Sequence, residues 1–124
     1  MSERRRALGQ QGELLAETFL RQKGYEIIGR NVRTRRGEID LIAADKDSLV
    51  FVEVRTRSSL AFGTAAESIT WRKRQKLREL AMDYLQSLPH YVPSFRFDVI
   101  AIHVPASSSA ACRQASIEHI EHAF

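Results

Sequence analysis

The stretch GEIDLIAADKDSLVFVEVRTR, residues 37–57, decides the fold, because it contains two apolar runs around a short polar turn. Such runs, rich in valine and isoleucine and separated by turn residues, are typical of paired strands. The stretch therefore predicts an antiparallel hairpin with its turn at residues 45–48. An even-numbered loop there places Asp40 opposite Glu53, and Glu38 opposite Arg55.

The two faces of this hairpin differ in character, since side chains alternate across a strand. One face is predicted to be wholly apolar, and it carries Ile39, Leu41, Ala43, Val50, Val52 and Val54. The other face is apolar near the turn and charged farther from it, where it carries Glu38, Asp40, Glu53 and Arg55.

Two carboxylates directly opposed on a sheet repel each other, and their partial burial adds a desolvation cost. A shared proton, a nearby Arg or Lys, or a divalent cation offsets that repulsion. Mg²⁺ favours one or two carboxylates together with water and phosphate oxygens, so Asp40 and Glu53 are candidate ligands. The alternative is a structural ion-pair network that uses Arg55 and Arg57.

The remaining elements are predicted from helical periodicity and from further apolar runs. We expect a helix over residues 5–23, a strand over 25–32, a helix over 65–87, a central strand over 94–104 and a weaker strand within 115–124. A connection rich in serine and alanine precedes that last strand. The predicted fold class is mixed α/β: a five-stranded sheet with helices packed on it.

Lys73 interrupts the apolar stripe of the second predicted helix. The stripe comprises Ile69, Leu77, Leu80, Tyr84 and Leu88, and Lys73 falls four residues after Ile69 and four before Leu77. A lysine that faces a sheet is costly unless it meets an anion, here the carboxylate pair or a phosphate. The alternative is that its aliphatic stem packs and its ammonium group reaches solvent.

Length and composition indicate one globular domain over residues 1–124, with 44% hydrophobic and 27% charged residues. No apolar run approaches the ~20 residues that cross a membrane, and the first residues do not resemble a secretory signal. Cys112 is the single cysteine, so no internal disulfide forms and a reducing compartment is expected. We therefore expect a cytoplasmic protein without a membrane partner.

The net charge is only +4, but the basic residues are clustered. Such clusters can neutralise phosphates, which supply most of the non-specific affinity for nucleic acid. The alternative is a solvated basic surface. The candidate nucleic-acid-binding residues are Arg33, Arg35, Arg36, Arg57, Arg72, Arg74 and Lys76.

Five segments together resemble, in order and spacing, the YraN family of small bacterial proteins. They are GQQGELLAETFL, GYEIIGRNVRTRRGEIDLIA, LVFVEVRTR, ITWRKRQKL and FRFDVIAI. That family is similar to the PD-(D/E)xK nuclease superfamily, particularly its branched-DNA resolvases. The resemblance implies a restriction-endonuclease-like fold, with a central mixed sheet flanked by helices.

Carried over by position, the resemblance also implies an active site that uses Mg²⁺ or Mn²⁺. Asp40, Glu53 and the Val54 carbonyl would bind the metal, and Glu13 would complete its site. Arg55 occupies the place of the superfamily lysine, and Lys73 matches a basic residue on the following helix. Related resolvases act as dimers, and a homodimer would suit a two-fold substrate.

Arg55 bears on whether the chain is an enzyme, because an arginine guanidinium stays protonated in proteins and cannot act as a general base. It can still bind a phosphate or stabilise developing charge. The expected function is a metal-dependent nuclease acting on DNA. The alternatives are a non-catalytic nucleic-acid-binding module and a protein-interaction partner. His119 and His122 are a weak metal candidate, since no third ligand is in view, and Trp71 is a candidate for stacking on a base.

Overall fold

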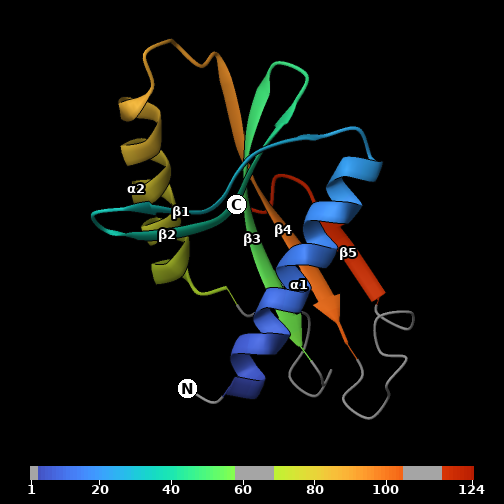
Figure 1. Cartoon of the computed structure of the whole chain (residues 1–124). Helices are drawn as coiled ribbons and strands as arrows, with labels where there is room; N and C mark the ends of the chain where they lie inside the picture. The colour runs from blue at the N-terminus through green and yellow to red at the C-terminus, as the bar shows by residue number, and fades with distance from the viewer. Residues whose placement is uncertain (1–2, 58–68, 105–115) are drawn as a thin grey trace.

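The computed structural model describes residues 3–57, 69–104 and 116–124, with side chains from residue 7 onward. In chain order its elements are α1 (Glu3–Gln22), β1 (Glu26–Thr34), β2 (Gly37–Asp45), β3 (Ser48–Arg57), α2 (Trp71–Ser87), β4 (Ser94–His103) and β5 (Ser116–Ile120) (Figure 1). This is the predicted succession of a helix, three strands, a helix and two strands. Cys112, the predicted helix start at 65–68 and the predicted connection before β5 lie outside the described residues.

The five strands form one sheet in the order β1-β2-β3-β4-β5. β3 and β4 run parallel, whereas the other neighbouring pairs are antiparallel. β4 lies between β3 and β5, as its largely apolar sequence predicts. The sheet is therefore mixed and five-stranded, which confirms the predicted fold class and is compatible with a restriction-endonuclease-like fold.

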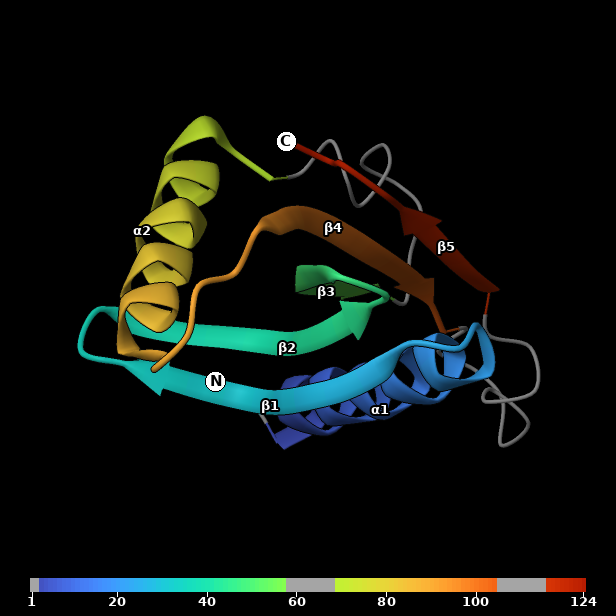
Figure 2. The same ribbon diagram turned by 90° about the horizontal axis from the view of Figure 1, so that it is seen from above.

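The two helices cover opposite faces of the sheet (Figure 2). α1 packs through Ala16 and Leu20 on one face, and α2 packs through Leu77 and Leu80 on the other. Each face thereby has its own buried apolar cluster. Within the described residues, neither helix is long and apolar enough to cross a membrane.

The β2–β3 hairpin has the predicted register, with Asp45 opposite Ser48 and Leu41 opposite Val52. Lys46 in its turn adopts a left-handed backbone, with φ of 58°. The paired region starts at Leu41, because β2 diverges from β3 over the residues before it, so the predicted pairs Asp40–Glu53 and Glu38–Arg55 lie outside the ladder. Glu38 instead faces Arg33 of β1. Ile39 consequently joins the cluster beneath α2, so the prediction that it shares a face with Leu41 is wrong.

α2 begins at Trp71, six residues later than predicted, because Thr70 is extended and caps the helix. The Thr70 hydroxyl accepts a hydrogen bond from the Lys73 backbone N–H at 3.1 Å, which satisfies one of the free donors of the first turn. Ile69 is buried, as the apolar stripe predicts, but it lies before the helix. Because the cap fixes the start of α2, it also fixes the direction in which the Lys73 side chain projects from the first turn.

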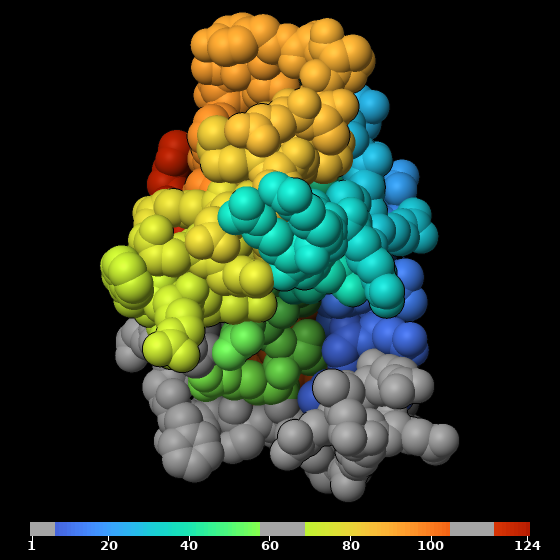
Figure 3. Space-filling model, turned by 90° about the vertical axis from the view of Figure 1, so that its left-hand side faces the viewer, coloured from blue at the N-terminus to red at the C-terminus, as the bar shows by residue number. Residues whose placement is uncertain are grey.

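The tip of the β1–β2 hairpin lies against the middle of α2 (Figure 3). Arg36 at this tip forms ion pairs with Glu79 and Asp83 of the helix, at 3.7 and 3.5 Å. Each of these pairs is partly exposed, so each contributes little to stability. They nevertheless specify how the hairpin lies on α2.

Candidate active site

The candidate site lies at the fork where β2 diverges from β3. Asp40 precedes Leu41, the first residue of β2 that pairs with β3. Its side chain, instead of the backbone, hydrogen-bonds to β3. Its Oδ2 accepts a hydrogen bond from the Val54 backbone N–H at 2.9 Å. The Asp40 carboxylate therefore points at β3, beside Glu53. It occupies the place where a backbone hydrogen bond would continue the ladder.

The two carboxyl groups interact strongly, as the hairpin register predicts. Burial and the neighbouring Glu53 charge together raise the pKa of Asp40 to about 7, although the Val54 N–H opposes the shift. A hydrogen bond between the two carboxyl groups contributes in the same direction, and it requires a proton on one of them. Without a cation, the pair is thus poised to hold a shared proton near neutral pH.

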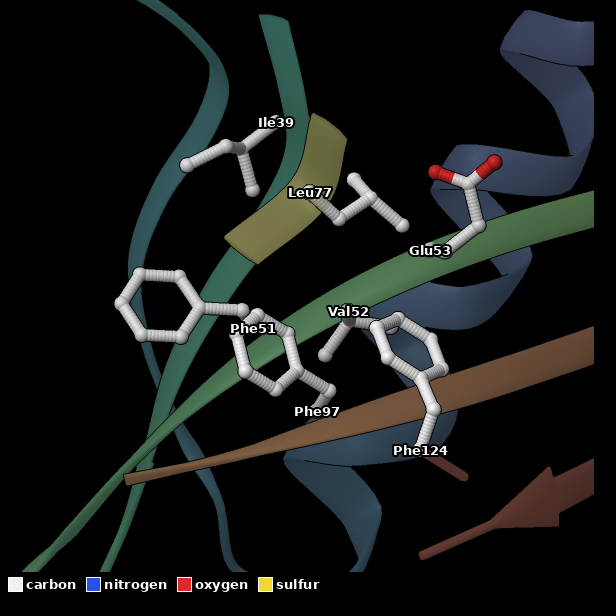
Figure 4. Close-up of a pocket in the computed structure, with 7 residues that line it drawn as sticks. All are labelled: Ile39, Phe51, Val52, Glu53, Leu77, Phe97 and Phe124. Carbon is white, nitrogen blue, oxygen red and sulfur yellow. The ribbon is translucent and has the colours of Figure 1, made fainter. Parts of the chain in front are cut away.

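Glu53 is buried, with 6% of its surface exposed, and its carboxylate lies beside Leu77 at the edge of an apolar pocket (Figure 4). Two basic side chains approach its Oε2: Arg55 Nη1 at 3.5 Å and Lys73 Nζ at 3.9 Å. Both are about 40% exposed, so they can also meet a ligand from solvent. The structure thus brings together Asp40, Glu53, Arg55 and Lys73.

Glu13 reaches the same region from α1. Its Oε1 accepts a hydrogen bond from Asn31 Nδ2 at 3.2 Å. Burial raises the pKa of Glu13, and the nearby Asp40 and Glu38 charges add to the shift against the opposing hydrogen bond from Asn31. Glu13 therefore belongs to the electrostatic surroundings of Asp40. That it completes the metal site, as the resemblance implies, stays a prediction.

The donor atoms at the fork suit a hard divalent cation. Asp40 and Glu53 supply carboxylate oxygens, and the Val54 carbonyl adds a neutral oxygen, which is the ligand type that Mg²⁺ and Mn²⁺ prefer. In the described part of the chain, no three His, Cys, Asp or Glu side chains are close enough to hold a metal together. A cation at the fork would therefore rely on two carboxylates, the carbonyl, water and phosphate oxygens.

Asp40→Asn is expected to stabilise the metal-free protein by about 1–3 kcal/mol at pH 8. The folded pKa of about 7 exceeds the ordinary 3.8, so the folded state holds more protons between these values. Stability contributed by Asp40 is present at low pH and lost as pH rises through 7, whereas asparagine has no proton to lose. Urea unfolding in EDTA at pH 5 and pH 8 measures this, and an equal pH dependence in both proteins would contradict it.

Most of the basic candidates lie on β1, the β1–β2 turn and α2, around the fork. Arg33, Arg35, Arg72 and Lys76 are exposed, whereas Arg57 is partly buried at the end of β3. Two candidates make contacts within the fold: Arg36 pairs with α2, and the Arg74 guanidinium lies 5.7 Å from the Phe124 ring centroid. Trp71, at the start of α2, is 74% exposed.

A second polar cluster, centred on Asp98 of β4, was not recognised from the sequence. Asp98 is fully buried and accepts from Arg96 Nε at 3.0 Å, while His119 Nε2 lies 2.7 Å from its Oδ2. The backbone N–H of His122 also donates to it. Of the weak metal candidate formed by His119 and His122, the ring of His119 contacts Asp98, whereas His122 contacts it only through the backbone. An aspartate within a central apolar strand, the same signal that identified Asp40, was available to find it.

Burial by itself raises the pKa of Asp98, but hydrogen bonds from His119 and Arg96 outweigh that effect. The pKa of Asp98 therefore lies below its ordinary value, in contrast to that of Asp40. The two aspartates thus differ in the direction of their pKa shifts, which is upward for Asp40 and downward for Asp98. The Arg96 guanidinium compensates the charge of Asp98, whereas Asp40 is opposed by a second carboxylate.

Comparison with known proteins agrees with the resemblance deduced from the motifs. The model of the family described as "Uncharacterised protein family UPF0102" matches residues 12–102. UPF0102 proteins from Chlorobium limicola and Rhodococcus opacus are 48% and 47% identical to this chain over 118 residues, which cover 95% of it and 92% and 96% of those proteins. A UPF0102 protein from Moorella thermoacetica is 46% identical over 124 residues, the full length of both chains. The chain therefore belongs to the UPF0102 (YraN) family.

Proposed function

We propose that this protein is a nuclease that uses Mg²⁺ or Mn²⁺ to hydrolyse phosphodiester bonds in DNA, with branched DNA as a candidate substrate. The observation that carries the proposal is the carboxylate pair at the strand fork. Asp40 and Glu53 repel each other, and two cationic side chains stand beside them within reach of solvent. A purely structural ion pair does not require the second carboxylate.

A divalent cation bound by Asp40, Glu53 and the Val54 carbonyl would polarise a phosphate and lower the pKa of water. The surrounding residues have separate tasks. Lys73, on the first turn of α2, stabilises negative charge on the phosphate oxygens. Arg55 binds and orients the phosphate, since its guanidinium stays protonated and matches phosphate geometry.

The raised pKa of Asp40 sets the pH range of this activity. Binding a cation requires both carboxylates ionised, so the cation competes with the shared proton below a pH of about 7. Affinity for Mg²⁺ should therefore rise with pH up to about 7 and level off above it. The basic residues Arg33, Arg35, Arg72 and Lys76 would bind the DNA backbone on either side of the scissile phosphate.

The test is cleavage of labelled duplex, single-stranded and branched DNA in Mg²⁺, Mn²⁺ or EDTA. We expect cutting that requires the metal, falls as salt rises, disappears in Asp40→Ala and is fastest on branched DNA. Asp47→Ala, in the hairpin turn, is the matched control and should cut normally.

The second candidate function is a non-catalytic nucleic-acid-binding protein on the same scaffold, and arginine at position 55 in place of lysine favours it. Salt-sensitive DNA binding without cleavage, unchanged by EDTA and by Asp40→Ala, would replace the nuclease proposal with this one. A homodimer is part of the proposal, and sedimentation of the DNA complex tests it. Absence of any salt-sensitive DNA binding would leave a protein-interaction role.

A further inference from the structure

Asn31 lies inside β1 but has a backbone conformation foreign to strands. Its φ is 48°, in the left-handed region that non-glycine residues rarely adopt and asparagine tolerates best. The pairs Arg30–Leu41 and Val32–Ile39 on either side of it place Asn31 opposite Asp40. This irregularity therefore lies directly beside the metal-binding candidate.

The side-chain amide of Asn31 bridges two carboxylates from different elements. Nδ2 donates to Glu13 Oε1 of α1 at 3.2 Å and to Glu38 Oε1 of β2 at 2.9 Å. An NH₂ group has two donor hydrogens, so one amide can satisfy both acceptors. α1, β1 and β2 are thus joined by one residue next to Asp40.

The chemistry of this bridge differs from that of an ion pair. An arginine or lysine at position 31 would hold Glu13 equally well, but it would cancel the negative charge that attracts a cation. An amide holds the carboxylate and leaves its charge in place. Glu13 and Asn31 also line a groove of about 240 Å³ between α1 and β1, so a hydrated cation can approach them.

We propose that Asn31 is a positioning residue that holds Glu13 beside Asp40 and so strengthens divalent-cation binding at the fork. This inference rests on the proposed function, because it concerns the same metal site. Asn31 acts through Glu13 and need not touch metal or DNA. Glycine is the informative replacement, since it removes the side chain with its amide and still accepts a left-handed backbone.

The experiment is titration of the full chain with Mn²⁺, followed by electron paramagnetic resonance, for the unmodified protein, Asn31→Gly, Asn31→Ala, Glu13→Gln and Asn31→Gly/Glu13→Gln. We expect Asn31→Gly and Asn31→Ala to weaken Mn²⁺ binding about tenfold. In the Glu13→Gln background, Asn31→Gly should have no further effect, because the two residues act as one unit.

A purely structural role predicts a different ordering. Only Asn31→Ala would then perturb the protein, through its strained φ, and Asn31→Gly would bind Mn²⁺ normally. Mn²⁺ affinity of Asn31→Gly within twofold of the unmodified protein would overturn the inference alone, as would equal losses with and without Glu13. Absence of Mn²⁺ binding by the unmodified protein would overturn both the inference and the proposed function.

Discussion

Glu53→Gln is expected to reduce metal-dependent DNA cleavage by about 10³-fold or more, because it removes one of the two carboxylates that bind the cation. Glutamine has nearly the same shape and keeps the carbonyl oxygen, so the apolar pocket around position 53 remains filled. The loss of cleavage therefore measures the effect of removing the negative charge of Glu53, and not of changing the shape of its side chain. Initial rates at saturating Mg²⁺, measured on the preferred DNA substrate, give its size.

The same variant should retain its fold, which separates a loss of function from unfolding. Glutamine relieves the repulsion with Asp40 while it weakens the contacts with Arg55 and Lys73, so the two effects on stability oppose each other. Glu26→Gln, an exposed position on β1, is the matched control. Cleavage by Glu53→Gln within tenfold of the unmodified rate would contradict the assignment of Glu53 as a metal ligand.

Asp98→Ala is expected to lower the free energy of unfolding by about 3–5 kcal/mol, the largest loss of stability that we expect from a single side chain. Asp98 is fully buried, and its removal leaves the buried ring of His119 without its carboxylate partner. Arg96, whose side chain is 10% exposed, would keep only its ion pairs with the more exposed Asp45 and Glu121. The bond from the His122 backbone, which fastens the segment after β5, is also lost.

Urea unfolding followed by circular dichroism measures this loss, with Asp47→Ala as an exposed control that should change stability by less than about 0.5 kcal/mol. The pH dependence gives a second check. The lowered pKa of Asp98 means that its stabilisation is present above pH 3.8 and is lost as pH falls toward the folded pKa. A stability of Asp98→Ala close to that of Asp47→Ala would show that the cluster is not stabilising.

The spacing of apolar residues along the sequence was sufficient to predict the hairpin, its register from Leu41 to Val52 and the presence of two helices. Alternation of apolar residues specifies a strand register, since a shift by one residue would expose the whole buried set. This register predicts that Asp40 and Glu53 lie side by side on the hairpin. Lys73 was found in the same way, as the charged member of an apolar stripe.

The divergence of β2 from β3 was not visible in that pattern. Ile39 continues the alternation in the sequence. However, the residues of β2 that precede Leu41 diverge from β3, and Ile39 therefore joins the α2 cluster. Packing against α2 decides this, because Leu77 and Leu80 offer Ile39 a buried surface there. The start of α2 was also misjudged, since the Thr70 cap competes with the helical pattern before it.

The sequence alone identifies Asp40, Glu53 and Asp98 as charged residues within apolar strands. Burying an ionised carboxylate is costly, so such residues are rare in these strands and indicate a specific role. The hairpin register also predicts that Asp40 meets Glu53, whereas only the tertiary structure showed that His119 lies beside Asp98. Asp98 finds Arg96 and His119 and is compensated, whereas Asp40 finds Glu53 and is opposed. Arg96 lies two residues before Asp98 on β4, but His119 lies on β5. The place of His119 beside Asp98 depends on the order of the strands in the sheet, which no local spacing encodes.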